Sequence, residues 1–354
     1  MELIDADIAA AHTLPSSYYT DSDTFQSVLS TFGGHWHFAA HKNQLANANV
    51  LPIDNPLNEA MLLSMHEGEL RALSNVCTHR GMLVCTEASE CKQLQCAYHG
   101  RTFGLDGTFK NMPEFDDVAD FPTPADNLRT FPLAEWKGLL FNTVDSEDFQ
   151  GFISVVEQRV GWLAIEEFQY DPSRHRDYQI DANWALYVDN YLEGFHIPYV
   201  HGDLHDVLDY DGYRTELFDG GVLQIGMAKD GDICFDLPEG HPDAGQRVAA
   251  YYFWLHPGLM LNFYPWGLSI NLVIPVDVNR TRIVYHGLVG DVDQLGKGAG
   301  GDLDKVEAED QFIVESCQKG VQSSAYQRGR YSPTRESGVH HFHRIISSGL
   351  SREV

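Results

Sequence analysis

The pattern of hydrophobic and polar positions changes twice along the chain. Residues 1–42 follow a largely helical pattern and then form a turn around the stretch GGHWHF. From residue 43 to residue 150, short apolar runs such as EAMLLSM and GLLFNTV alternate with turn residues. Short runs separated by turn residues are typical of strands joined by tight turns. This pattern predicts a small all-β domain over residues 43–150.

The remaining residues, 151–354, predict a different kind of domain. The segment FQGFISVVEQRVGWLAI has the periodicity of an amphipathic helix and marks the boundary. Beyond it, long apolar runs such as VLQIGMA, AAYYFWL and LSINLVIPV predict strands, and helical patterns are grouped beside them. Grouped strands next to grouped helices favour an α+β fold. The glycine-rich stretch GKGAGG indicates a flexible connector.

Composition and charge restrict the partners of the chain. It has 354 residues, of which 24 are basic and 51 acidic, so its net charge is −27 at pH 7. Such a chain repels phosphate backbones and anionic lipid headgroups, so neither a nucleic-acid nor a membrane partner is expected. The N-terminal stretch lacks a basic region followed by an apolar run, so no signal peptide is expected and a cytoplasmic location is predicted.

Two histidines and a glutamate lie close together in the stretch DNYLEGFHIPYVH. Pro198 should end a helix near Ile197, because the residue before a proline is pushed out of the α region. Glu193 and His196 would then share one helix face, and His201 would lie just beyond the helix end. This arrangement could aim two imidazoles at one metal ion. The same residues also suit surface or core histidines that bind nothing.

A second cluster of candidate ligands lies in the predicted all-β domain. It consists of Cys77 and His79 in CTHRG and of Cys96 and His99 in CAYHG. Each short motif mixes one cysteine with one histidine, and this mixture suits a Rieske [2Fe-2S] cluster in which one iron takes both cysteines and the other both histidines. The glycine after each motif lets the backbone approach the sulfides closely. A tetrahedral zinc site is the alternative.

A carboxylate near the C-terminus is a candidate for a third ligand beside the two histidines. In the segment LDKVEAEDQFIVESCQKG, one set of residues recurs at helical spacing and should face the core. The members of this stripe are Leu303, Val306, Asp310, Ile313 and Cys317. A buried carboxylate is costly unless it is paired, protonated or bound to metal, so Asp310 is either a metal ligand or part of an internal salt bridge. Glu307 and Glu309 fall off the stripe and are expected to be solvated.

The two clusters together resemble one family. A Rieske motif followed by Glu-x2-His-x4-His is similar to the α subunit of Rieske non-haem iron oxygenases, also called ring-hydroxylating oxygenases. The resemblance implies an α+β protein in which a small all-β Rieske domain (43–150) is inserted in a helix-grip-like catalytic domain with an antiparallel sheet, made of residues 1–42 and 151–354. It implies mononuclear Fe(II) held by His196, His201 and Asp310. Glu193 occupies the place of a catalytic acid that bridges the cluster of one subunit to the iron of its neighbour.

The resemblance also implies an activity and its partners. The chain would be a terminal oxygenase that activates O2 with electrons from an NAD(P)H-dependent reductase or a ferredoxin, since its sequence contains no flavin or nucleotide motif. The family works as a head-to-tail homotrimer, in which electrons pass between subunits. An electron-transfer Rieske protein without oxygenase activity and a zinc-binding regulatory protein are the alternatives from other classes.

The substrate implied by the resemblance is a small organic molecule. The stretch DNYLEGFHIPYVH is similar to the branch of the family that acts on choline, glycine betaine and carnitine, which predicts monooxygenation or demethylation of a quaternary ammonium or N-methyl compound. Phe263, Tyr264 and Trp266 lie near one another in the sequence and could attract such a cation through their rings. These aromatics could equally be core residues. Hydroxylation or O-demethylation of an aromatic compound is the alternative reaction.

Overall fold

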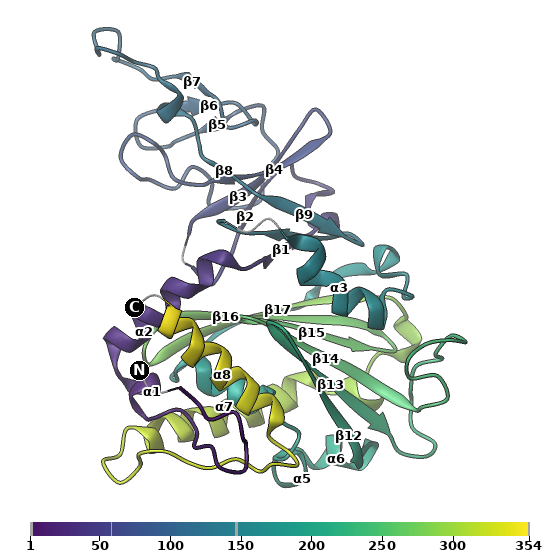
Figure 1. Cartoon of the computed structure of the whole chain (residues 1–354). Coiled ribbons are helices and arrows are strands. Elements are labelled where there is room, and N and C mark those ends of the chain that lie inside the picture. Colours follow the sequence, from purple (N-terminus) through teal and green to yellow (C-terminus); the bar gives the residue numbers. More distant parts are fainter. Residues whose placement is uncertain (1–2, 58, 146–147, 353–354) are drawn as a thin grey trace. The chain divides into compact units, whose positions relative to one another are not determined.

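The computed structural model describes residues 3–57, 59–145 and 148–352, and the chain divides into two compact units (Figure 1). One unit is Gly33–Gln150, and the other joins the residues up to Phe32 with those from Gly151 onward. The smaller unit thus begins at Gly33 and not at residue 43. The reason is that the stretch expected to be a turn contains a strand, β1 (His37–His41), which pairs with β10 (Leu139–Asn142) of the same unit.

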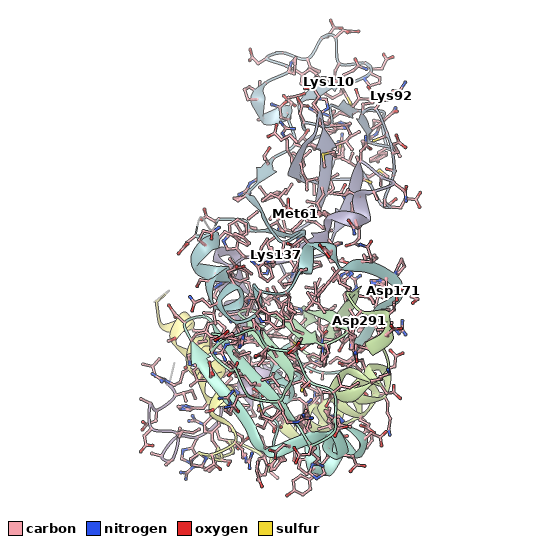
Figure 2. All side chains as sticks on the ribbon, turned by 90° about the vertical axis from the view of Figure 1, so that its right-hand side faces the viewer. Met61, Lys92, Lys110, Lys137, Asp171 and Asp291 are labelled. Carbon is pink, nitrogen blue, oxygen red and sulfur yellow. The ribbon has the colours of Figure 1, made fainter. Side chains whose placement is uncertain are left out.

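The unit Gly33–Gln150 is built from short antiparallel strands. Its other strands are β2 (Val50–Ile53), β3 (Met61–His66), β4 (Glu69–Ser74), β5 (Leu94–Gln95), β6 (Thr102–Phe103), β7 (Phe109–Asn111), β8 (Thr130–Phe131) and β9 (Leu133–Trp136). The described strands form sheets in the orders β1–β10–β9, β2–β3–β4–β8 and β5–β6–β7. Lys110 lies on β7 and Lys92 just before β5, whereas Met61 begins β3 (Figure 2). The all-β character expected of this part is confirmed.

The larger unit contains a seven-stranded antiparallel sheet in the order β11–β17–β16–β15–β14–β13–β12. Its strands are β11 (Gln169–Ile180), β12 (Leu208–Phe218), β13 (Gly221–Ala228), β14 (Val248–Leu255), β15 (Leu259–Tyr264), β16 (Gly267–Asp277) and β17 (Arg280–Val289). Strands β13, β15 and β16 are buried along nearly their whole length. Burial on both faces explains why their sequences are mostly apolar, and the buried polar side chains of Asn262, Ser269 and Asn271 bond to one another.

Helices complete the larger unit. They are α1 (Ser17–Thr20), α2 (Ser22–Ser30), α3 (Phe149–Val160), α4 (Trp184–Tyr191), α5 (Ile197–Val200), α6 (Gly202–Val207), α7 (Leu303–Val321) and α8 (Ser337–Arg352), with short 3-10 turns between some of them. Helix α4 contacts α7, α8 and β16, and α8 also lies against β12 and β13. In the described part of the chain, no helix is both long enough and apolar enough to cross a membrane.

The helix that carries the first candidate ligands ends earlier than the sequence suggested. Helix α4 stops at Tyr191, and Pro198 lies in the first turn of the new helix α5, where proline is tolerated. The Glu193 carboxylate accepts the backbone N–H groups of Phe195 and His196, the latter at 3.0 Å. These N–H groups would otherwise bond to carbonyls of a continuing helix, so the side chain of Glu193 helps to end it. The prediction of a helix up to Ile197 is therefore wrong.

The glycine-rich stretch predicted to be a flexible connector is packed instead. Gly298–Gly300 form a 3-10 turn in which Ala299 and Gly300 are buried. A Cβ atom at Gly300 would lie 2.3 Å from Nε1 of Trp266 and 2.8 Å from the ring of Tyr264. Glycine is needed here because the backbone runs directly against these two aromatic rings.

Candidate active site

The two Cys/His motifs fold into the same turn although their spacings differ. The N–H of Gly81 donates to the carbonyl of Cys77 at 3.0 Å, and the N–H of Gly100 donates to the carbonyl of Cys96 at 3.0 Å. Both glycines have positive φ angles, 72° and 74°. That conformation is easily reached only by glycine, so each motif needs one to close its loop. The two loops are thus built as a matched pair.

The matched loops bring the four side chains together, with the cysteines buried and the histidines more exposed. The Cys77 and Cys96 thiols are buried, and burial raises the pKa of Cys77. The rings of His79 and His99 lie 4.8 Å apart at 71° and are more exposed. The ligand atoms of a single metal ion lie close together. Among the described residues, no three of these four side chains place their ligand atoms within 4.8 Å of one another. The arrangement therefore suits a cluster larger than a single zinc ion.

The second group of candidate ligands comes together from three segments of the larger unit. His196 precedes α5, His201 lies between α5 and α6, and Asp310 is on α7. Nε2 of His201 is 3.0 Å from Oδ1 of Asp310, and Nε2 of His196 is 3.7 Å from the same oxygen. In the parts of the chain that the structure describes, this is the only group of His, Cys, Asp or Glu side chains whose ligand atoms converge within 4.8 Å.

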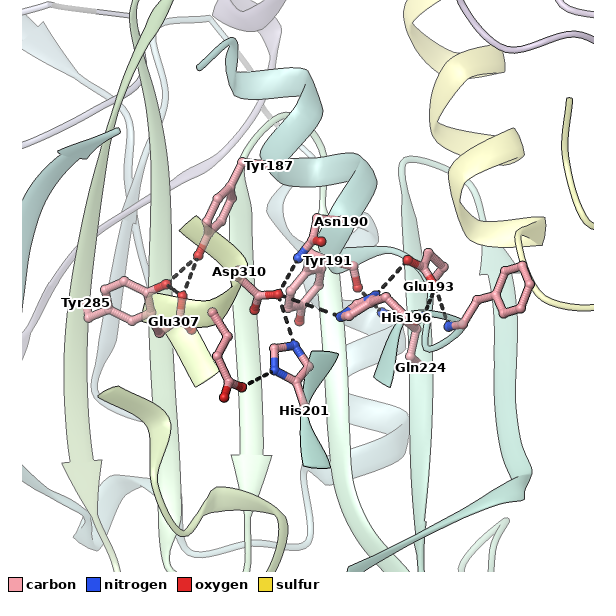
Figure 3. Close-up of polar contacts among 12 residues, drawn as sticks. Tyr187, Asn190, Tyr191, Glu193, His196, His201, Gln224, Tyr285, Glu307 and Asp310 are labelled. Atoms are coloured by element: carbon pink, nitrogen blue, oxygen red, sulfur yellow. Dashed lines mark hydrogen bonds and ion pairs between the residues drawn. The ribbon is translucent and has the colours of Figure 1, made fainter. Parts of the chain in front are cut away.

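Each of the two imidazoles is held by a glutamate through its other nitrogen (Figure 3). Nδ1 of His196 lies 2.6 Å from Oε1 of Glu193, and Nδ1 of His201 lies 2.7 Å from Oε2 of Glu309. A carboxylate on Nδ1 places the proton there and leaves Nε2 free to bind metal. Both Nε2 atoms face Asp310, so the two glutamates aim the rings at one point.

Glu309 was expected to be solvated, and that prediction is wrong. Its side chain keeps 30% exposure but bonds to His201. The stripe on α7 predicted only which residues face the core, and His201 approaches this helix from a distant part of the sequence. The stripe itself is also displaced, since Cys317 is exposed while Val314 and Gln318 are buried.

Electrostatics around the three candidate ligands favour a bound cation. Burial alone would lower the pKa of His201, but hydrogen bonds and charges from Asp310 and Glu309 raise it. Asn190 donates from Nδ2 to Oδ1 of Asp310 at 2.7 Å and fixes that carboxylate. Two imidazoles and one carboxylate with space left between them form the donor set of non-haem Fe(II) oxygenases, so the residues fit that metal.

A cavity opens beside this group and is lined mainly by aromatic and polar side chains. Its tyrosines are Tyr187, Tyr191, Tyr213, Tyr252 and Tyr264. Of the three aromatics suggested by the sequence, only Tyr264 lines this cavity. Phe263 is fully buried against Phe253, and Trp266 stacks on Tyr264 at 5.4 Å and borders a neighbouring cavity. Tyrosine rings from helix α4 and from strands β12, β14 and β15 therefore form the wall next to the candidate ligands.

Glu307 is the second acid that the helical periodicity wrongly predicted to be solvated. It lines the cavity and accepts hydrogen bonds from the hydroxyls of Tyr187 at 3.0 Å, Tyr178 at 3.5 Å and Tyr285. Burial, and then the charge of Asp310, raise the pKa of Glu307 to about 7, while the tyrosine hydroxyls oppose that rise. The prediction of a solvated Glu307 is wrong, because Tyr178 and Tyr285 reach it from β11 and β17, far away in the sequence.

Comparison with known protein families decides the class of this chain. Residues 35–122 match the model of the Rieske [2Fe-2S] domain. Residues 162–351, more than half of the chain, match the model of the ring hydroxylating alpha subunit (catalytic domain). The chain belongs to the ring-hydroxylating oxygenase α-subunit family. The α+β fold predicted from the sequence is confirmed, and the interpretations as a zinc regulator or as a simple electron carrier are wrong.

Relatives of this Rieske oxygenase cover nearly its whole length. The carnitine monooxygenase oxygenase subunit of Escherichia coli (strain K12) is 30% identical over 361 residues, covering 95% of this chain and 93% of that protein. The chloroplastic choline monooxygenase of Beta vulgaris is 28% identical over 348 residues, covering 94% and 76%. The chain is thus a Rieske-type oxygenase, the terminal component of its system, and a [2Fe-2S] cluster and a mononuclear iron are its cofactors.

Solved structures share the fold of this Rieske oxygenase. A quaternary ammonium Rieske monooxygenase in complex with L-carnitine aligns with a TM-score of 0.80 at 24% identity, covering 99% of this chain and 100% of that one. Naphthalene 1,2-dioxygenase from Rhodococcus sp. aligns with a TM-score of 0.76 at 18% identity, covering 95% and 93%. Both ammonium and aromatic oxygenases therefore use this architecture, so the fold alone does not select the substrate.

Proposed function

We propose that this Rieske oxygenase monooxygenates or demethylates a small quaternary ammonium compound. The observation that carries the proposal is the tyrosine-lined cavity beside His196, His201 and Asp310, with the acid Glu307 in its wall. Aromatic faces and a negative charge attract a quaternary ammonium group, whereas a neutral aromatic ring gains nothing from the charge. The names of the carnitine and choline monooxygenases among its relatives support the same substrate class.

The proposal assigns the metal ligands as follows. Cys77 and Cys96 hold one iron of the cluster and His79 and His99 the other, as in Rieske centres generally. His196, His201 and Asp310 hold the mononuclear Fe(II), which supplies the site at which O2 is activated when it is bound.

The residues around the mononuclear site have separate tasks in this proposal. Glu193 and Glu309 orient the two imidazoles and keep the proton on Nδ1, so both Nε2 atoms stay available. Asn190 fixes the ligand carboxylate of Asp310. The tyrosine wall binds the methyl groups of the cation and displaces water from the reacting end of the substrate.

The partners belong to the proposal too. A reductase that uses NAD(P)H, or a ferredoxin, would supply electrons to the cluster. We infer a homotrimer in which Glu193 links His196 to the cluster of the neighbouring subunit. Inter-subunit electron transfer is described for a similar quaternary ammonium Rieske monooxygenase, which supports this inference. The cytoplasmic location stays a prediction.

Substrate-dependent oxygen uptake tests the proposed function. The holoenzyme with a generic reductase is given choline, glycine betaine, L-carnitine and, as the competing class, naphthalene and methoxybenzoate. The proposal predicts uptake coupled to consumption of at least one ammonium compound and no coupled uptake with the aromatics. Coupled uptake with an aromatic compound alone would overturn it.

A further inference from the structure

Glu307 occupies a place between two cavities. It lies on α7 three residues before Asp310, and it lines both the cavity beside the candidate iron ligands and a neighbouring one bordered by Tyr178 and Tyr285. Glu307 and Asp310 are each met by a donor from α4. Tyr187 donates to Glu307 at 3.0 Å, and Asn190 donates to Asp310 at 2.7 Å. Asp310 faces two imidazoles, whereas the hydrogen-bond partners of Glu307 in the described chain are tyrosine hydroxyls.

The carboxyl group of Glu307 is held in place by hydrogen bonds but has no cationic partner among the described residues. Its Oε2 accepts all three tyrosine hydrogen bonds. Its Oε1 has no hydrogen-bond partner among the described residues and is not a buried atom, so it stays accessible from the cavities. Over the same residues, Glu307 forms no ion pair with lysine or arginine. Burial raises the pKa values of Tyr187 and Tyr285 well above 10, so both hydroxyls stay protonated and keep donating.

A carboxylate taken out of water without a cation is unfavourable, and hydrogen bonds from neutral hydroxyls offset only part of the cost. A cation that enters the cavity supplies the missing charge. A metal ion held by His196, His201 and Asp310 would not be the direct partner of Glu307. These three side chains surround a different point, about one helical turn away along α7. Tyr191, Tyr252 and Tyr264 line the same cavity, so a cation beside Glu307 also meets aromatic rings.

We propose that Glu307 is the specificity-determining residue for the substrate, pairing its accessible carboxylate oxygen with the cationic nitrogen. Tyr178, Tyr187 and Tyr285 act as positioning residues that hold this carboxylate at the cavity wall. A quaternary nitrogen has no N–H to donate, so charge and contact with the tyrosine rings provide its recognition. This inference rests on the proposed function and extends it, since it names the group that separates cations from neutral molecules of the same shape.

The test compares a cation with its neutral isostere. Choline and 3,3-dimethylbutan-1-ol differ in one atom, a nitrogen in place of a quaternary carbon, and so have nearly the same shape. Calorimetry measures the binding of each to the oxidised holoenzyme, to Glu307→Gln and to Glu315→Gln, the last removing a charge from the same helix away from the cavity. Iron content and the Rieske absorption spectrum verify that each variant is folded and loaded.

The proposal predicts that Glu307→Gln weakens choline binding at least about tenfold, as expected when one member of a buried charge pair is removed, and changes binding of the neutral alcohol less than about twofold. Glu315→Gln should bind both ligands as the wild type does. Equal weakening of both ligands by Glu307→Gln would show that Glu307 only shapes the cavity, and would overturn the proposal.

Two further outcomes separate this inference from the proposed function. If the wild type prefers choline and Glu307→Gln keeps that preference, the inference is wrong and the proposed function stands. If the wild type itself binds both ligands equally, this inference is wrong, whereas the proposed function is decided by the oxygen-uptake test. Should Glu307→Gln lose its metal centres, Glu307→Asp keeps the charge but withdraws it by one methylene. This variant should weaken the binding of choline alone, and an equal weakening of the binding of both ligands would overturn the proposal.

Discussion

His196 and His201 each bond through Nδ1 to a glutamate, although the two glutamates come from different parts of the chain. Glu193 holds His196 from three residues away in the chain, whereas Glu309 reaches His201 from another helix. The first contact is local and could be expected from the spacing in DNYLEGFHIPYVH. The second depends on where α7 lies against the segment around α5, and no periodicity within α7 reveals that. The two contacts also lead to different predictions.

Removing the charge of Glu309 should weaken iron binding. In Glu309→Gln the amide does not hold the Nδ1 proton of His201 as firmly, and the loss of such an outer contact typically costs about 10- to 100-fold in metal affinity. Competition with a chelator measures the affinity, and the Rieske spectrum should not change. Glu315→Gln is the matched control on the same helix. Unchanged iron affinity in Glu309→Gln would show that Glu309 does not support iron binding through His201.

Removing the charge of Glu193 should affect electron transfer as well. Glu193→Gln, loaded with excess Fe(II), should reoxidise its reduced cluster more slowly than the wild type, because the proposed link between His196 and the neighbouring cluster loses its charged acceptor. Glu309→Gln, loaded in the same way, is the control, since it orients an imidazole but lies off that route. Stopped-flow absorbance follows the cluster. Equal rates in the two variants would remove Glu193 from the route.

At the level of helices and strands, the buried acid Asp243 bonds to side chains from several segments of the larger unit. Asp243 is 3% exposed and pairs with Arg159 of α3 at 2.7 Å and Arg214 of β12 at 2.6 Å, and Tyr251 of β14 donates to it at 2.9 Å. Burial alone would raise the pKa of Asp243, but these partners hold it below 3.8. A carboxyl of this kind contributes stability above its unfolded pKa and loses it as the pH falls through its folded pKa.

Asp243→Asn should lower the free energy of unfolding by about 3 kcal/mol, because it leaves two arginines without their buried partner. Urea unfolding at pH 7 followed by tryptophan fluorescence measures the change. Asp177→Asn, which breaks the exposed pair with Arg282, should cost less than about 1 kcal/mol. The difference between wild type and Asp243→Asn should shrink as the pH falls below 3.8, and a constant difference would contradict the assigned ion pairs.

The elements predicted well are those whose signal is local. The apolar run GLLFNTV contains β10, the run LSINLVIPV lies within β16, and the helix after residue 148 is α3. Most of the failures come from contacts between distant segments, whereas the early end of helix α4 comes from the local contacts of Glu193. Gly300 packs against the rings of Trp266 and Tyr264, and Glu307 is met by tyrosines of β11 and β17. A single sequence shows the charge of Glu307 but not the tyrosines that surround it.

At the scale of the molecule, the sequence showed two kinds of metal site in two kinds of domain. The matched loops could be predicted, since both glycines and all four candidate cluster ligands lie in short motifs. The boundary of the smaller unit could not, because β1 joins it through pairing with a strand about a hundred residues later in the chain. Since each unit carries the residues of one centre, each centre should be removable without loss of the other.

A single turnover of the fully reduced oxygenase, without any reductase, tests the central claim most directly. Reduced enzyme is mixed with O2 and an ammonium substrate, cluster absorbance is followed, and the product is quantified. A quaternary ammonium compound should speed cluster reoxidation and be oxygenated. Asp310→Ala should keep its cluster, lose the mononuclear iron and form no product. Product from Asp310→Ala at the wild-type level, or wild-type turnover with an aromatic compound in place of the ammonium substrate, would contradict the account.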